Sequence, residues 1–137
     1  MIYILEDDED RVRRFQAVAA KIALQLPVKF WRNAYAMIDD LADALEHASL
    51  ISLDHDLEPL PGDKTDPGTG YDVVQLLTKL IPCCPVIIHT SNAQCGNWME
   101  GALSTAGWQF DRVLPLGDDW IEKDWAPLVQ QRLKCSK

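Results

Sequence analysis

Three absences narrow the classes of protein to which this sequence can belong. No apolar stretch approaches the ~20 residues that span a bilayer. No basic segment followed by a long apolar run stands at the Met1 end, so we expect neither a membrane span nor a signal peptide. The four cysteines form no C-x-x-C pair and no zinc-binding spacing. These features predict a cytoplasmic protein with reduced thiols.

Positive charge is also scarce. The chain has 13 Lys and Arg residues against 21 Asp and Glu residues, which gives a net charge of -8. Binding along a phosphate backbone needs Lys and Arg in excess, so a broad nucleic-acid surface is excluded. A small phosphorylated substrate or the terminus of a nucleic acid is easier for so acidic a chain to accommodate than a long polyanion.

The apolar residues predict an α/β fold. A chain of 137 residues fits one domain, 1–137, with a substantial core. Short apolar runs predict strands at 2–5, 28–31, 50–53, 86–88 and 112–116. Helical spacing of apolar residues covers 12–26, 37–45, 71–80, 94–106 and 125–134, with Asn33 as the N-cap of the second helix. This alternation predicts a three-layer α/β/α sandwich around a five-stranded parallel sheet.

One long irregular segment interrupts the alternation. It runs from Glu58 to Gly70 and is rich in proline and glycine. Loops of this length are more often functional or mobile than idle. Lys64 is its only cation and is a candidate contact for a phosphate.

Ionisable side chains gather where three of the predicted strands end. They are Glu6-Asp7, Asp54-His55-Asp56 and His89-Thr90. The carboxyl ends of parallel strands lie at the same edge of a sheet, so these groups converge if the three strands are neighbours. Several carboxylates held together repel each other unless a cation neutralises them, and oxygen ligands suit Mg²⁺. The pattern predicts a site for Mg²⁺ (or Mn²⁺).

The sequence resembles the receiver domain of bacterial response regulators over nearly its whole length. Glu6 and Asp7 match the family's acidic pair, Asp54 its phosphate-accepting Asp, and Thr90 the Thr or Ser after the fourth strand. The resemblance implies the receiver (flavodoxin-like) topology. Leu114 departs from it, because it stands where the family has a Lys that contacts the phosphoryl group.

A divergent branch, the cyclic-phosphate processing receiver domains, is a closer match. The motifs that carry this resemblance are Asp54-His55-Asp56-Leu57, Gly70-Tyr71-Asp72, His89-Thr90-Ser91-Asn92 and Gly96-Asn97-Trp98-Met99. The resemblance implies a phosphate-processing domain that acts on cyclic phosphate linkages, in a nucleotide or at an RNA end. That activity is itself inferred for the family.

Hydrolysis of a cyclic phosphodiester requires a proton acceptor, a proton donor to the leaving oxygen and charge stabilisation at the phosphoryl oxygens. We expect His55 and His89 to share the acid and base roles, without assigning either role to one of them. Asp56 or Asp72 would orient a histidine by accepting its other ring N–H.

The remaining polar residues would hold the metal ion and the phosphate. Asp54 and Asp7 are the expected metal ligands, and Glu6 acts through water. Thr90 and Asn92 would donate hydrogen bonds to phosphate oxygens.

Some of these residues also have a purely structural interpretation. Glu9 and Asp10 suit a solvated helix start. Asp72 is placed to cap the helix that begins near Tyr71. Trp98 could face a ligand, whereas packing is expected of the other tryptophans, namely Trp31, Trp108, Trp120 and Trp125.

Three functions therefore stand as hypotheses. The first is a metal-dependent phosphoesterase, in effect a cyclic phosphodiesterase. The second is an atypical receiver that is phosphorylated at Asp54, or senses through it, and signals to a partner. The third is an interaction module without catalysis. Leu114 disfavours the second hypothesis, and the two histidines favour the first.

Overall fold

The protein is built on one parallel sheet. The computed structural model describes residues 1–22 and 26–135. Its five strands have the order β2-β1-β3-β4-β5 and every neighbouring pair is parallel. The strands are β1 (Ile2–Leu5), β2 (Val28–Trp31), β3 (Leu50–Leu53), β4 (Val86–His89) and β5 (Phe110–Val113). This order places a topological switch point between β1 and β3, and ligands bind at the carboxyl ends of strands at such a point.

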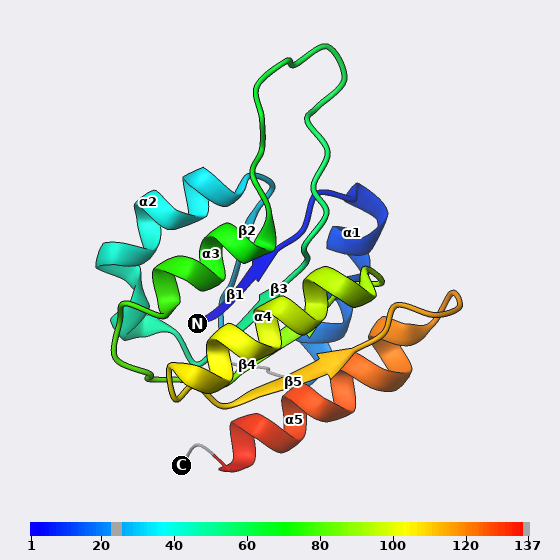
Figure 1. Cartoon of the computed structure of the whole chain (residues 1–137). Helices are drawn as coiled ribbons and strands as arrows, with labels where there is room; N and C mark the ends of the chain where they lie inside the picture. The colour runs from blue at the N-terminus through cyan, green and yellow to red at the C-terminus, as the bar shows by residue number, and fades with distance from the viewer. Residues whose placement is uncertain (23–25, 136–137) are drawn as a thin grey trace.

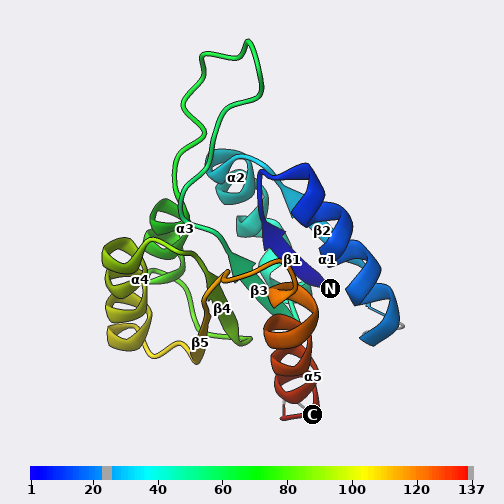
Figure 2. The ribbon, with the colours of Figure 1, turned by 90° about the vertical axis from the view of Figure 1, so that its right-hand side faces the viewer.

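Helices cover both faces of the sheet, as Figures 1 and 2 show. One face packs against α1 (Glu9–Ile22), the π-helical turn η2 (Ile121–Trp125) and α5 (Ala126–Cys135). The other face packs against α2 (Ala34–Ala44), α3 (Gly70–Leu77) and α4 (Ala93–Thr105). A short 3-10 turn, η1 (Leu45–His47), follows α2. The predicted three-layer sandwich and the predicted adjacency of the first, third and fourth strands are confirmed.

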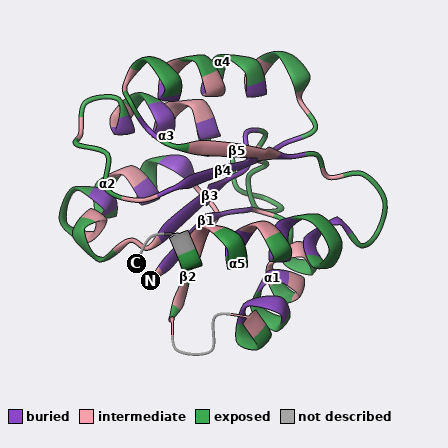
Figure 3. Cartoon of the chain, turned by 90° about the horizontal axis from the view of Figure 1, so that it is seen from below, coloured by how far each residue is buried: buried purple, intermediate pink, exposed green. Residues whose placement is uncertain are grey.

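The core lies on both sides of the sheet, since strand residues alternate between its faces. In β1, Tyr3 and Leu5 pack with the α2–α4 layer, and Ile2 and Ile4 pack with α1 and α5. Figure 3 shows the central strands almost entirely buried. The packing role expected of Trp31, Trp108, Trp120 and Trp125 is confirmed, because all four are buried.

The fifth strand begins two residues earlier than predicted and ends at Val113. Pairing of β5 with β4 starts directly after the turn at Gly107, because Val86 N–H donates to the carbonyl of Gln109. Asp111, which looks unlike a strand residue, is paired with α5, because it accepts two hydrogen bonds from Arg132, at 2.6 and 2.7 Å. Pro115 has no N–H to continue the ladder.

Helix boundaries also differ from the predictions. The first helix begins at Glu9 and ends within the described residues at Ile22, so Leu26 lies beyond it, and the predicted positions 23–25 lie outside the described residues. The third helix ends at Leu77, and the predicted positions 78–80 form turns instead. The last helical segment begins at Ile121 rather than Trp125, as a π-helical turn. Asn33 caps α2 as predicted, since its Oδ1 accepts from the N–H groups of Tyr35 and Ala36.

The segment between β3 and α3 is irregular, as predicted, and protrudes from the body of the molecule (Figure 1). An isolated antiparallel bridge between Asp56 and Thr69 joins its two ends. Its root therefore lies beside the carboxyl end of β3. Among the helices of the described residues, none is long and apolar enough to cross a membrane.

Candidate phosphate and metal site

Three carboxylates meet at the carboxyl ends of β1 and β3. Glu6 and Asp7 follow β1, and Asp54 follows β3, whose Leu53 pairs with Leu5. Each of the three offers an oxygen, and these oxygens all lie within 4.8 Å of one another. The predicted convergence of the acidic residues is therefore what the sheet produces.

Glu6 is fully buried and held from both sides. Its Oε2 accepts from the backbone N–H groups of Asp7 and Asp8, at 3.1 Å each. Its Oε1 lies 3.2 Å from Nε2 of His89 and 3.7 Å from the guanidinium of Arg11. Burial opposes its ionisation, but the contacts with the His89 imidazole, the N–H of Asp8 and the charge of Arg11 together outweigh burial and lower the pKa of Glu6. Glu6 is therefore the carboxylate of the three that stays charged most readily.

The pKa values of the other two carboxyl groups move the opposite way. Burial, reinforced by the charge of Glu6, raises the pKa of Asp54 to about 8, although the N–H of His55 donates to its Oδ1 at 2.8 Å. Burial also raises the pKa of Asp7, whose Oδ2 accepts from the N–H of Glu58 at 2.7 Å. In both carboxyl groups burial is the largest cause of the raised pKa, and the neighbouring Glu6 carboxylate raises it further.

A divalent cation fits this donor set. The ligand atoms are all carboxylate oxygens, which suit a hard ion such as Mg²⁺. Oε1 of Glu6 is buried, and no described residue makes a hydrogen bond to it with good geometry. A buried oxygen without such a partner, beside two carboxyl groups that resist ionisation, is the arrangement that a bound cation relieves.

His89 lies behind the acidic cluster rather than in front of it. It ends β4 with no exposed surface, between the rings of Phe15 and Trp120, at centroid distances of 5.2 and 5.8 Å. Nδ1 lies 2.7 Å from Oγ of Ser52, and Nε2 faces Glu6 at an angle poor for a hydrogen bond. The contacts of His89 therefore favour positioning of Glu6 over the proton transfer to a phosphate that the sequence led us to expect.

A buried polar chain extends this arrangement into the core. Nε1 of Trp125 donates to Oγ of Ser52 at 3.0 Å, and Ser52 contacts His89. Because Ser52 can donate to Nδ1, its hydroxyl favours the tautomer whose Nε2–H faces Glu6. Sequence reasoning missed Ser52, although a polar residue inside the otherwise apolar strand β3 was a signal for it.

His55 has a different environment. Its side chain is 10% exposed, and Nδ1 lies 2.7 Å from Oδ1 of Asp56. Because a carboxylate only accepts, Nδ1 of His55 is the donor. The amide of Asn92 bridges two elements: Nδ2 donates to Asp56, and Oδ1 caps α4 by accepting from the N–H of Cys95. Thr90 is buried, and its Oγ1 accepts from the N–H of Asn92.

Asp72 does not contact a histidine. It forms a capping box with Thr69: Thr69 N–H donates to its Oδ2 at 2.9 Å, and its own N–H donates to Thr69 Oγ1 at 3.4 Å. The capping interpretation is confirmed. Of the two carboxylates named as candidates to orient a histidine, Asp56 is the one in contact with His55.

Gly70 fixes α3 against the site. Its N–H donates to the carbonyl of His55 at 3.0 Å, and a Cβ there would overlap the carbonyl oxygen of Asp54. Only glycine permits this approach. The cation that receivers carry after the fifth strand has no counterpart at Leu114, which is half-exposed in a groove along α5.

The fold and the site together define a receiver-like α/β domain with an acidic centre. The family described as Cyclic-phosphate processing Receiver domain matches residues 2–105, and the chain belongs to this family. A search of curated proteins gives no match.

Solved structures of receiver domains share the fold over the whole chain. A two-component response regulator from Legionella pneumophila has a TM-score of 0.69 at 16% identity and covers 98% of this chain and 97% of its own. A CheY-like receiver domain protein from Methanospirillum hungatei has a TM-score of 0.67 at 17% identity, covering 98% and 94%. A chain of the CheX-CheY-BeF3-Mg+2 complex from Borrelia burgdorferi has a TM-score of 0.63 at 11% identity, covering 98% and 86%. At these identities the similarity establishes the fold.

Proposed function

We propose that the protein is a metal-dependent phosphoesterase that hydrolyses cyclic phosphate linkages of a nucleotide or an RNA end. The observation that carries the proposal is the placement of the His55–Asp56 pair next to the acidic cluster at one edge of the sheet. Receivers of the same fold share an acidic centre, and the Borrelia complex contains Mg²⁺ by name. The family name adds the cyclic phosphate.

Glu6, Asp7 and Asp54 would hold the cation. A bound Mg²⁺ would neutralise charge on the phosphoryl oxygens and orient the phosphate. His89 would act as a positioning residue, because its only close charged partner among the described residues is Glu6.

His55 would exchange protons through Nε2, since Nδ1 donates to Asp56. Asp56 keeps the ring in one tautomer and orientation. In the reaction a water oxygen bonds to phosphorus, one P–O bond to the ribose breaks, and a proton ends on the departing ribose oxygen. Asn92, whose amide donates to Asp56, and Thr90, whose Oγ1 accepts from the N–H of Asn92, would donate hydrogen bonds to phosphoryl oxygens.

The test is turnover of adenosine 2′,3′-cyclic phosphate with Mg²⁺, followed by phosphorus NMR. We expect His55→Gln to lower kcat by about 100-fold or more, as for loss of a general acid–base group. His47→Gln is the matched control, because the side chain of His47 is exposed in η1 and pairs with Glu46, away from the acidic cluster. Full activity of His55→Gln, or full activity after metal chelation, would overturn the proposal.

The second candidate is an atypical response-regulator receiver. The full-length match to receiver folds favours it, and Asp54 follows the third strand beside the acidic pair. Under this alternative Asp54 accepts a phosphoryl group or senses a metal ion, and the protein signals to a partner. Incubation with acetyl phosphate and Mg²⁺, read by intact mass, tests it. A stable phosphoryl group on the unmodified protein that is missing from Asp54→Asn supports a receiver. If calorimetry detects no binding of Mg²⁺ or Mn²⁺, both functions are contradicted.

A further inference from the structure

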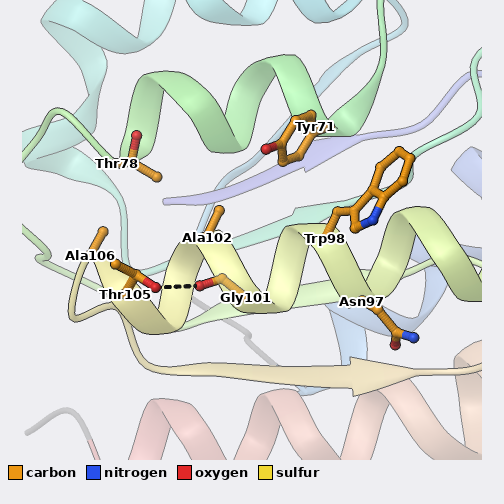
Figure 4. A pocket seen from close by; sticks show the side chains of 8 residues that line it. All are labelled: Tyr71, Thr78, Asn97, Trp98, Gly101, Ala102, Thr105 and Ala106. Carbon is orange, nitrogen blue, oxygen red and sulfur yellow. Dashed lines mark hydrogen bonds between the residues drawn. The ribbon is translucent and has the colours of Figure 1, made fainter.

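A neutral groove lies between α3 and α4 at one side of the proposed site. It is open to solvent and has a volume of about 710 Å³. Figure 4 shows Tyr71 and Trp98 at one end of it and Thr78, Thr105 and Ala106 at the other. No charged residue lines this groove in the described part of the chain, although the chain as a whole carries a net charge of -8.

The aromatic end of the groove is the end next to the acidic cluster. Tyr71 directly follows Gly70, whose backbone packs on the carbonyl of Asp54. Trp98 lies roughly 9 Å along α4 from its cap Asn92, at a rise of about 1.5 Å per residue. Asn92 in turn binds Asp56.

The two rings form an open aromatic wall. Their centroids are 6.4 Å apart and their planes are inclined by 55°. Trp98 is 52% exposed, whereas the other four tryptophans are buried. A large ring that is left half in solvent at the mouth of a groove costs stability and offers a flat surface for stacking.

We propose that this groove binds the base of a single nucleoside cyclic phosphate, with the base stacked on Trp98 and bordered by Tyr71. The inference rests on the proposed function, because it takes the phosphate to lie at the acidic cluster. The neutral lining suits an uncharged heteroaromatic ring. The negative charge of the chain favours one nucleotide over a longer strand. Stacking tolerates all bases, so little preference among them is expected.

The test compares kcat/KM for adenosine 2′,3′-cyclic phosphate with kcat/KM for a ribose 2′,3′-cyclic phosphate that lacks a base. In the unmodified protein we expect the base to raise kcat/KM by about 10- to 100-fold, as for one stacked base. Trp98→Ala should remove most of this advantage, and Trp98→Phe should retain part of it. Ile81→Ala is the matched control: Ile81 is an 86% exposed apolar residue outside the groove, and its replacement should leave the ratio unchanged.

The outcomes separate this inference from the proposed function. Hydrolysis of both compounds with the same ratio in Trp98→Ala overturns base binding and leaves the phosphoesterase intact. A change in oligomeric state of Trp98→Ala without a change in the ratio assigns the groove to a second copy of the chain and also overturns it. If neither compound is hydrolysed, calorimetry with adenosine decides. A heat of binding that the unmodified protein shows and Trp98→Ala does not supports the base site. Absence of a heat of binding in the unmodified protein overturns it.

Discussion

Nε2 of His89 lies 3.2 Å from Oε1 of Glu6, and both side chains are completely buried. The contact lowers the cost of burying Glu6, because the polar Nε2–H of His89 faces the carboxylate in a site that water does not reach. The pair also keeps a carboxylate ready at the site where a cation would bind.

His89→Gln should destabilise the fold. The substitution removes the partner of a buried carboxylate and loosens packing between Phe15 and Trp120, so we expect a loss of about 2–4 kcal/mol in the free energy of unfolding. Urea denaturation measures it. His55→Gln is the comparison: its ring contacts exposed Asp56, and we expect a loss of about 1 kcal/mol or less. Equal losses in the two variants would contradict the buried-pair interpretation.

The stability of the metal-free protein should depend on pH through Asp54. Its pKa is about 8 in the folded protein and near 3.8 in a free chain. Between these values the folded state holds a proton that the unfolded state has lost, so this group's contribution to stability falls as the pH rises. Urea denaturation at pH 5, 7 and 9 should show a smaller fall in Asp54→Asn.

Mg²⁺ should reverse this fall in the unmodified protein, because an ion that binds only the folded state stabilises it. Asp54→Asn should show little stabilisation by Mg²⁺ at pH 9. A metal response as large as that of the unmodified protein would remove Asp54 from the ligand set.

Gly70→Ala should be costly and Gly101→Ala should not. A Cβ at Gly70 overlaps the carbonyl of Asp54, whereas one at Gly101 meets nothing within 4 Å. We expect Gly70→Ala to lose about 1–3 kcal/mol. Gly101→Ala, within α4, should gain about 0.5–1 kcal/mol. Thermal denaturation measures both, and similar melting temperatures would contradict the close approach of α3 to β3.

The capping box predicts an energetic coupling between Thr69 and Asp72. Each single replacement by Ala should cost about 1 kcal/mol, because each removes a hydrogen bond at the start of α3. The double variant should lose less than the sum of the two, since both residues serve one cap. Additive losses, with a larger effect of Asp72→Ala on turnover than on stability, would instead indicate an orienting role for Asp72.

The sequence predicted those parts of the fold in which one residue pattern dominates. Strands β1, β2 and β3 were placed with their observed ends, because each apolar run is followed directly by a charged residue, namely Glu6, Arg32 and Asp54. The strand β5 was placed too late because Asp111 looks unlike a strand residue and finds its partner, Arg132, on α5, which sequence alone does not reveal.

Parts of the candidate site could likewise be predicted from the sequence, and other parts could not. The meeting of Glu6, Asp7 and Asp54 follows from the rule that parallel strands end at one edge. The depth of His89 does not, because it depends on the packing of Phe15 and Trp120 around the ring. Likewise, the contact of Asp56 with both His55 and Asn92 requires the path of the chain after β3.

The bridge between Asp56 and Thr69 has a consequence for variation in this protein. Because the two ends of the protruding segment are joined at its root, residues 57–68 can change in length with little effect on the spacing of the strands and helices. Insertions or deletions at its tip would alter what approaches the acidic cluster and leave the cluster in place. This segment is therefore where the chain can vary in length on an unchanged sheet.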